Sequence, residues 1–457
     1  MLSRSTARPT RLRAPGLRLS ARASLPVLTM WGVGHVLLAI VARLVPVLGL
    51  VHALACLVVG VVIAARRPLY QVAYVVAYIA GAEVLWRMTR AGVFWEYGKY
   101  AVCVVLLVAM ARVRLRRNVG LGLGYLGLLL PSIALTISAL SPDIARQQIS
   151  FNISGPLSLA MCILFFSNIK LTSEQVTTAF FSLIGPVIGI AALTYFSTMS
   201  AQDLEFTGQS NSVTSGGFGP NQVSAVLGLA LLFCLLMLLE KRQSWRIKAP
   251  LLVLAVAFAV QAALTFSRGG IVMAALAAVG AMFYLVRDSR ARVTLFMVSA
   301  LLFSVGRYVV IPRLEVFTQG KLSERYLSTK SSNRNLLATN DLELFADNPL
   351  LGVGPGMGAS TRSDLGVNVA AHTEFTRVLG EHGIPGMISL SLLVVLGLRT
   401  TWRTRSLETR AVVVAMMIWF TLFLAVNAMR LVAPSFAFGL ACALANSSLM
   451  SRKSAPS

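Results

Sequence analysis

The sequence predicts an all-α membrane protein, a bundle of about 12 to 14 transmembrane helices with one long extracytoplasmic loop. Of the 457 residues, 56% are hydrophobic and only 13% are charged, whereas soluble domains carry about 25% charged residues. Apolar runs of roughly twenty residues, the length of a helix that spans a bilayer, recur along the chain. The net charge of +24 falls mainly between these runs, so it reflects membrane topology and indicates no nucleic-acid partner.

The first segment, residues 1–24, is rich in arginine and has no acidic residue. This composition predicts a basic cytoplasmic tail, although organelle transit peptides have a similar one. The apolar run that begins near Leu25 is longer than a signal-peptide core of about 7 to 15 residues. We therefore expect it to remain in the protein as the first membrane span.

Transmembrane helices with short loops are predicted over 25–311, and C-terminal transmembrane helices over 376–450. Residues 119–140 and 293–311 each predict a single span. Short loops on the side of the N-terminus hold most of the Lys and Arg, which predicts that both termini are cytoplasmic. Residues 451–457 are then a second cytoplasmic tail.

One sizeable polar region interrupts the apolar runs, a long loop at 312–375 outside the cytoplasm. Within it, residues 333–347 predict a short amphipathic helix that ends before Pro349. Leu337, Leu344 and Phe345 share its apolar face. We expect this helix to lie on the membrane surface or over a cavity, and any chemistry outside the cytoplasm to occur here.

The turn TFSRGG at 265–270 places Ser267 and Arg268 between two apolar runs, at the extracytoplasmic face. An arginine at membrane depth is costly unless it is solvated or used, and its planar guanidinium suits phosphate or carboxylate. Arg268 is therefore a candidate anion-binding residue. The alternative is an interfacial anchor whose head group reaches the lipid head groups.

The segment NPLLGVGPGMG at 348–358 includes Gly354 and Gly356 among its regularly spaced glycines. It predicts either a series of turns or a backbone nest for an anion. Upstream, GPNQ at 219–222 begins a span. Pro220 fits a first-turn proline there, and Asn221 is either a capping residue or a polar group exposed to a substrate.

His372 precedes TEFTRVLGEHG, which predicts a short helix from about Thr373 to His382 that stops at Gly383 before Pro385. The helix dipole at such a start disfavours imidazolium, so His372 is a candidate proton acceptor, with a structural histidine as the alternative. The sequence has no DxD triplet, HExxH or GxxxxGK[ST], so we expect no metal, no ATP-driven step and no cofactor.

Taken in order, GPNQ, the SRGG turn, NPLLGVGPG and EFTRVLGEHGIPG resemble the O-antigen ligase and O-antigen polymerase superfamily. The specific resemblance covers about 217–390. It implies a helical bundle like those of other lipid-linked-sugar glycosyltransferases, in the bacterial inner membrane, with its active site facing the periplasm beneath the long loop. It also implies a role in lipopolysaccharide or exopolysaccharide biosynthesis.

The activity implied by this resemblance is metal-independent, inverting transfer of a glycan from undecaprenyl diphosphate to a sugar hydroxyl, such as that of lipid A core. Arg268 and Arg334 match the arginines that hold the diphosphate, and His372 matches the residue that orients or deprotonates the acceptor. Two positions depart from the family pattern. Family members commonly have Asn directly after the histidine, whereas this sequence has Thr373 and then Glu374. Glu374 is therefore expected to share the acceptor role. No Trp follows Arg334, which leaves Arg325 as the alternative match.

Other functions remain open on the sequence alone. An O-antigen or exopolysaccharide polymerase would carry the same motifs and differ only in the acceptor. A transporter or flippase for the lipid-linked sugar would place charges near mid-span, whereas these charges gather at one face. An inactive scaffold within a polysaccharide assembly complex is a third possibility.

Overall fold

The computed structural model describes residues 25–201, 206, 209–239, 244–285, 293, 297, 304, 306–327, 334–363 and 372–450. Within these ranges all regular structure is helical, which confirms the predicted fold class. Eight helices are long and apolar enough to cross a membrane, and two shorter apolar helices, α4 and α11, accompany them. This protein is therefore a polytopic membrane bundle.

The first half of the chain forms a series of mostly long helices. They are α1 (Leu25–Leu44), α2 (Pro46–Arg66), α3 (Tyr70–Met88), α4 (Tyr97–Met110), α5 (Val119–Gly127), α6 (Ile133–Ala139), α7 (Pro142–Phe166), α8 (Ser173–Met199), α9 (Pro220–Leu238), α10 (Trp245–Leu264) and α11 (Gly269–Leu285).

Four shorter helices precede three long ones in the second half. They are α13 (Ile311–Phe317), α14 (Lys321–Leu327), α15 (Arg334–Asp347), α16 (Met357–Ser363), α17 (Glu374–Arg403), α18 (Leu407–Val426) and α19 (Ala433–Met450). Helix α15 confirms the helix predicted at 333–347, but Leu336 and Leu342 are exposed, so its apolar residues do not form a single face. Leu337 is buried, and Leu344 and Phe345 are half-buried.

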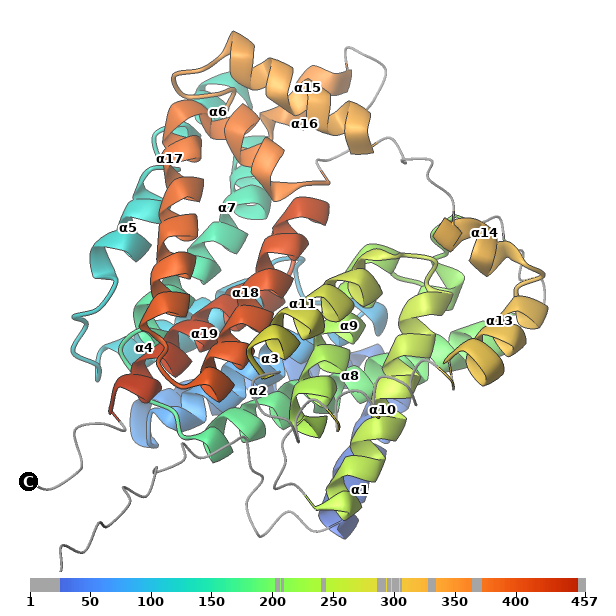
Figure 1. Ribbon diagram of the computed structural model, residues 1–457. Helices are drawn as coiled ribbons and strands as arrows, with labels where there is room; N and C mark the ends of the chain where they lie inside the picture. The colour runs from blue at the N-terminus through green and yellow to red at the C-terminus, as the bar shows by residue number, and fades with distance from the viewer. Residues whose placement is uncertain are drawn as a thin grey trace, which may run out of the picture.

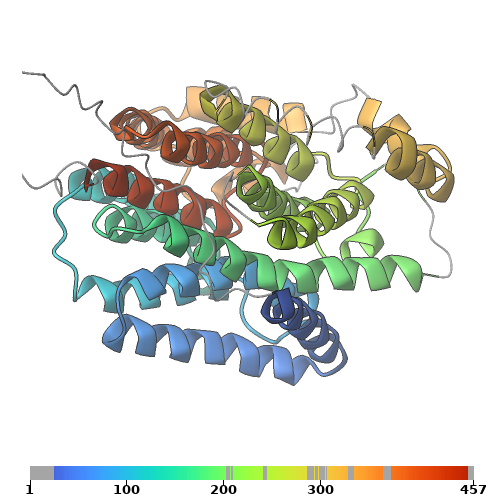
Figure 2. The same ribbon diagram turned by 60° about the horizontal axis from the view of Figure 1, so that its bottom comes forward.

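The core of the bundle lies around α3, α7, α8, α9 and α19, whose side chains are largely buried. Helices α1 and α2 lie at one outer edge of the bundle (Figure 2), and most of their residues face outward. Helices α15 and α16 lie across the end of the bundle at which α17 begins, while α13 and α14 lie beside α10 (Figure 1). The short helices of the long loop therefore form two groups, one over the start of α17 and one beside α10 (Figure 1).

The structure corrects the expected single span at 119–140. This segment forms two short helices, α5 and α6, that are separated at Pro131. Proline has no backbone N–H and clashes with the preceding helical turn, so the first helix cannot continue through it. Most of the expected span at 293–311 lies outside the described residues, and its last residues enter a π-helix at Gly306–Val310 followed by α13.

The expected stop at Gly383 is confirmed as a break inside α17. Gly383 has φ 61° and ψ −143°, which is not helical, and the chain resumes a helix immediately afterwards. A residue with a side chain would be strained at this φ. The short first part of α17, from Glu374, is therefore set apart from its long membrane part.

Helices α9 and α11 approach each other unusually closely at glycines. A Cβ atom added to Gly270 would lie 1.8 Å from the Ser224 carbonyl oxygen, and one added to Gly228 would lie 2.3 Å from the Gly270 oxygen. Gly269 and Gly270 lie at the start of α11, where Gly270 permits close helix packing.

We predict that Gly270→Ala destabilises the protein by about 1 to 3 kcal/mol, because the new methyl group would force the α9 and α11 backbones apart. The measurement is the thermal unfolding midpoint of the purified protein in detergent. Gly34→Ala is the matched control, since an added Cβ there meets nothing within 4 Å. Equal midpoints for the two variants would contradict the close packing.

Candidate functional site

The TFSRGG turn is held in an uncommon backbone conformation against α9. Phe266 has φ 55°, in the left-handed region, and its ring stacks on Phe206. The Ser224 hydroxyl of α9 donates to the Ser267 carbonyl at 2.8 Å and accepts from the Gly270 N–H at 3.2 Å. Strained conformations of this kind persist only where the surroundings hold them, often at functional sites.

This turn brings together four of the residues that the sequence singled out. The Ser267 hydroxyl donates to the Asn221 side-chain oxygen at 2.8 Å. Arg325 on α14 donates from Nε to the Phe266 carbonyl at 3.2 Å. Burial and the nearby positive charge of Arg268 both lower the pKa of Arg325. Arg325 of α14 therefore contacts the turn that carries Arg268, at the start of α11.

Arg334 is the first residue of α15, and its side chain lies outside the described residues. The structure thus joins Arg325 to the turn, while the role expected of Arg334 stays a prediction. Nearby, burial raises the pKa of the Tyr326 hydroxyl, and Arg268 and Arg325 act in the opposite direction.

The glycine-rich segment docks against the break in α17. Gly354 and Gly356 have φ of 96° and 83°. The break at Gly383 leaves helix carbonyls without their usual partners, and the loop satisfies two of them. Val353 N–H donates to the Gly380 oxygen at 3.0 Å, and Gly354 N–H donates to the Glu381 oxygen at 2.9 Å. These bonds favour a series of turns over an anion nest, because the Gly354 amide is already used.

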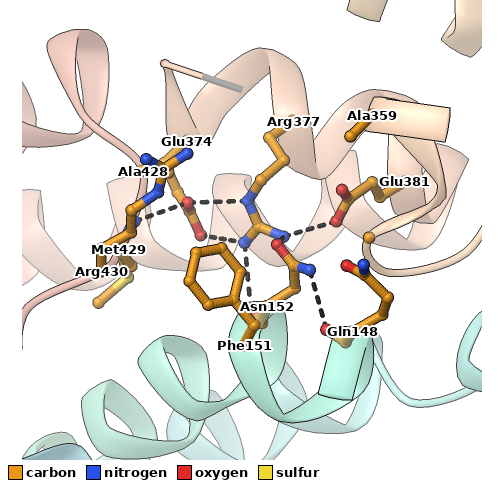
Figure 3. A pocket seen from close by; sticks show the side chains of 11 residues that line it. Gln148, Phe151, Asn152, Ala359, Glu374, Arg377, Glu381, Ala428, Met429 and Arg430 are labelled. Atoms are coloured by element: carbon orange, nitrogen blue, oxygen red, sulfur yellow. Dashed lines mark hydrogen bonds and ion pairs between the residues drawn. The ribbon is translucent and has the colours of Figure 1, made fainter. Parts of the chain in front are cut away.

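A buried ionic cluster lies in the first part of α17 (Figure 3). Arg377 donates to Glu374 from Nε at 3.0 Å and from Nη2 at 2.5 Å, and it donates to Glu381 from Nη1 at 2.6 Å. The three side chains are at most 7% exposed. Sequence reasoning missed Arg377 and Glu381. Their spacing from Glu374 puts all three on one helix face, and that was the available signal.

The loop between α18 and α19, residues 427–432, is held by two buried carboxylates from distant helices. Glu374 accepts from the Met429 N–H at 2.9 Å, and Glu83 on α3 accepts from the Val432 N–H at 2.7 Å. Arg87 forms an ion pair with Glu83 at 2.6 Å and donates to the Arg430 carbonyl at 3.1 Å. Arg430, which sequence reasoning also missed, therefore lies on a loop whose backbone is fixed on both sides.

Two adjoining cavities flank Arg430. The larger, which we call the α9 pocket, has a volume of about 140 Å³. Its polar lining comes from Asn221, Gln222, His372, Asn427 and Arg430. The smaller, the α17 pocket, has a volume of about 40 Å³. Its polar lining comes from Gln148, Asn152, Glu374, Arg377, Glu381 and Arg430, with Gly356 and Phe151 beside them.

His372 lies at the α9 pocket, immediately before α17. Thr373 caps that helix, since its hydroxyl oxygen accepts from the Thr376 N–H at 3.2 Å. The threonine also places His372 at the positive end of the helix dipole. The predicted residues thus fall into three neighbouring places: Arg268, Ser267 and Arg325 at the turn, Asn221 and His372 at the α9 pocket, and Glu374 and Gly356 at the α17 pocket.

The protein is thus a polytopic membrane bundle, and it has a largely buried site with ion pairs at one end of the bundle. Residues 259–391 match the family model described as O-antigen ligase. This segment of the chain is therefore similar to the O-antigen ligase family, as the motifs predicted. That segment includes the TFSRGG turn, the long loop and the first part of α17. A comparison with curated proteins found no match.

We predict that Arg377→Leu destabilises the protein by about 3 to 5 kcal/mol, because it leaves Glu374 and Glu381 buried without their cation. The measurement is the thermal unfolding midpoint in detergent. Arg146→Leu, at an exposed position on α7, is the control and should leave the midpoint nearly unchanged. An unaltered midpoint for Arg377→Leu would show that the cluster does not support the fold.

Proposed function

We propose that this protein is a membrane glycosyltransferase that transfers a glycan from undecaprenyl diphosphate to a sugar hydroxyl, in the manner of an O-antigen ligase. The observation that supports it most is that the TFSRGG turn, which carries Arg268 and is contacted by Arg325, adjoins the cavity that His372 lines. The O-antigen ligase family match implies glycan transfer and lipid-linked substrates.

The two arginines serve the leaving group in this proposal. When the glycosidic bond to the lipid carrier breaks, negative charge develops on the departing diphosphate. Guanidinium groups that are already positioned stabilise this charge without reorganising, which lowers the barrier. We propose Arg325 for this role beside Arg268, because its Nε donates to the carbonyl of Phe266, two residues before Arg268.

His372 serves the acceptor. At the start of α17 the helix dipole favours a neutral imidazole, which can accept the proton of an attacking hydroxyl. Glu374 is less suited to that task, since its two oxygens accept bonds from Arg377 and from Met429 N–H. We therefore propose that Glu374 holds the α18–α19 loop and the start of α17 in place.

The proposed orientation follows from the path of α1. Its last turn lies at the site end of the bundle, where Arg43 donates to the Met88 carbonyl at the end of α3. Residue 25 is therefore at the opposite end, one helix length away. With the basic segment 1–24 in the cytoplasm, the site faces the periplasm and the long loop at 312–375 covers it.

We predict that Arg268→Ala abolishes glycan transfer while the protein still inserts into the membrane, and that Arg325→Ala lowers transfer more than Arg334→Ala does. Each change removes a positive charge that would stabilise the departing diphosphate. The measurement is transfer rate by purified protein, with membrane yield as the folding control. Normal transfer by Arg268→Ala would remove this residue from the site.

We predict that His372→Ala lowers the transfer rate by roughly 100-fold or more, because general base catalysis contributes about that much. His372→Gln serves as the comparison, since it keeps a polar side chain that cannot accept the proton in the same way. A rate that falls only for Ala, and not for Gln, would assign His372 to positioning instead of proton transfer.

The function itself is tested by mixing the purified protein with an undecaprenyl-diphosphate oligosaccharide and either lipid A core or more of the same donor. A product on lipid A core supports the ligase, and a ladder of products on the lipid carrier supports the polymerase. No glycosidic product with either acceptor, together with donor movement across a bilayer, would replace the proposal with a transporter.

A further inference from the structure

We infer that Arg430 and Gln222 bind the diphosphate of the lipid-linked donor within the α9 pocket. This inference rests on the proposed function and adds two residues to it. Both residues lie outside the segment matched by the family model. They come from the α18–α19 loop and the first turn of α9, and both line the same cavity.

The orientation of Gln222 follows from its contact with Arg87. Arg87 Nη1 donates to the Gln222 side-chain oxygen at 2.6 Å. A guanidinium has only donors, so the amide atom that faces Arg87 must be the oxygen. The side-chain NH₂ therefore lies on the other side of the amide, beside Gly219, which lines the same pocket.

The backbone at Arg430 is fixed by hydrogen bonds on both sides. Its carbonyl accepts from Arg87, and the amides of Met429 and Val432, on either side of it, are bonded to Glu374 and Glu83. Its guanidinium lies over the ring of Phe151, a residue of the α17 pocket, at 5.5 Å from the ring centre, and Arg430 also lines the α9 pocket, so it stands where the two cavities adjoin. Burial lowers the pKa of Arg430, the nearby positive charges of Arg377 and Arg87 lower it further, and the carboxylates of Glu374 and Glu381 raise it. A bound oxyanion would act in the same direction as these carboxylates and would further stabilise the charged guanidinium.

The lining of the α9 pocket favours an anionic ligand. Among the described residues, none of its lining side chains is a carboxylate. The first turn of α9 also faces it, with Gly219 as an N-cap that provides no side-chain acceptor and Pro220 at the first helical position. This helix end carries partial positive charge. The acids Glu374 and Glu381 line the α17 pocket instead, where they pair with Arg377.

The link to the TFSRGG turn identifies the anion as the donor diphosphate. Asn221 lines the α9 pocket and accepts from Ser267, the neighbour of Arg268. A ligand in this pocket is therefore adjacent to the arginines of the turn. A diphosphate has enough oxygens to contact both the turn and Arg430, whereas the acceptor supplies a hydroxyl near His372.

Gln222→Glu is the sharpest test, because it keeps an oxygen for Arg87 and replaces the NH₂ donors with a second carboxylate oxygen. We expect it to weaken binding of undecaprenyl diphosphate, measured directly on purified protein without acceptor, by at least 10-fold. Gln147→Glu makes the same change at an exposed position on α7 and should bind like the wild type. Equal binding by Gln222→Glu and wild type would overturn the role of Gln222.

Arg430→Ala and Arg430→Lys form the second arm, with Arg146→Ala as control. We expect Ala to weaken undecaprenyl diphosphate binding by at least 10-fold. Lys should restore part of it, since it keeps the charge and loses the planar fork. In the transfer assay the KM for the donor should rise. A rise confined to the KM of a phosphorylated acceptor would assign Arg430 to the acceptor and overturn the inference.

The proposed function and this inference can fail separately. Wild-type protein that binds undecaprenyl diphosphate but transfers no glycan would contradict the function and leave the binding site intact. Wild-type protein that transfers glycan while Arg430→Ala and Gln222→Glu bind normally would contradict the inference alone. If Gln222→Glu does not fold, as judged by its unfolding midpoint, the comparison of Arg430→Lys with wild type decides.

Discussion

The bonds from two buried carboxylates to one loop are the interaction on which the site depends. Glu83 and Glu374 come from α3 and α17, and they accept the backbone amides of Val432 and Met429. Each carboxylate is also paired with an arginine of its own helix. A carboxylate buried among apolar helices is stable only when its charge and its lone pairs are satisfied. The loop, the two arginines and the two helices therefore hold one another in place, and the cavities form where they meet.

Glycine provides the second constraint, through close contacts between backbones. At Gly383 the chain leaves the helical conformation, and the glycine-rich loop fills the gap by donating to the Gly380 and Glu381 carbonyls. An added Cβ at Gly352 or Gly383 would meet backbone atoms at 2.4 to 2.5 Å. The break in α17 is thus an attachment point for the long loop, which explains how a polar segment is fixed to a membrane helix.

These two constraints produce neighbouring cavities with different chemistry. The α9 pocket is lined by amides, a histidine and an arginine, while the α17 pocket contains two carboxylates that are already paired with Arg377. Arg430 borders both. In the proposed glycosyl transfer, the α9 pocket receives both the anionic leaving group and the hydroxyl beside His372, while the paired carboxylates of the α17 pocket hold the surrounding backbone.

Local patterns in the sequence determined the helical membrane fold, the helix α15, the stop at Gly383 and the family motifs, because hydropathy, proline and glycine act over a few residues. Pro131 is also a local signal for the break between α5 and α6, but the continuous apolar run around it predicted a single span. Tertiary structure alone decided that Asn221 contacts Ser267, that Arg325 contacts Phe266 in the TFSRGG turn, and that Glu374 binds Arg377 and the Met429 amide. It also brought Arg430 to the pocket. Such contacts join residues far apart in the chain, and they arise only when helix packing sets which ends of the helices meet.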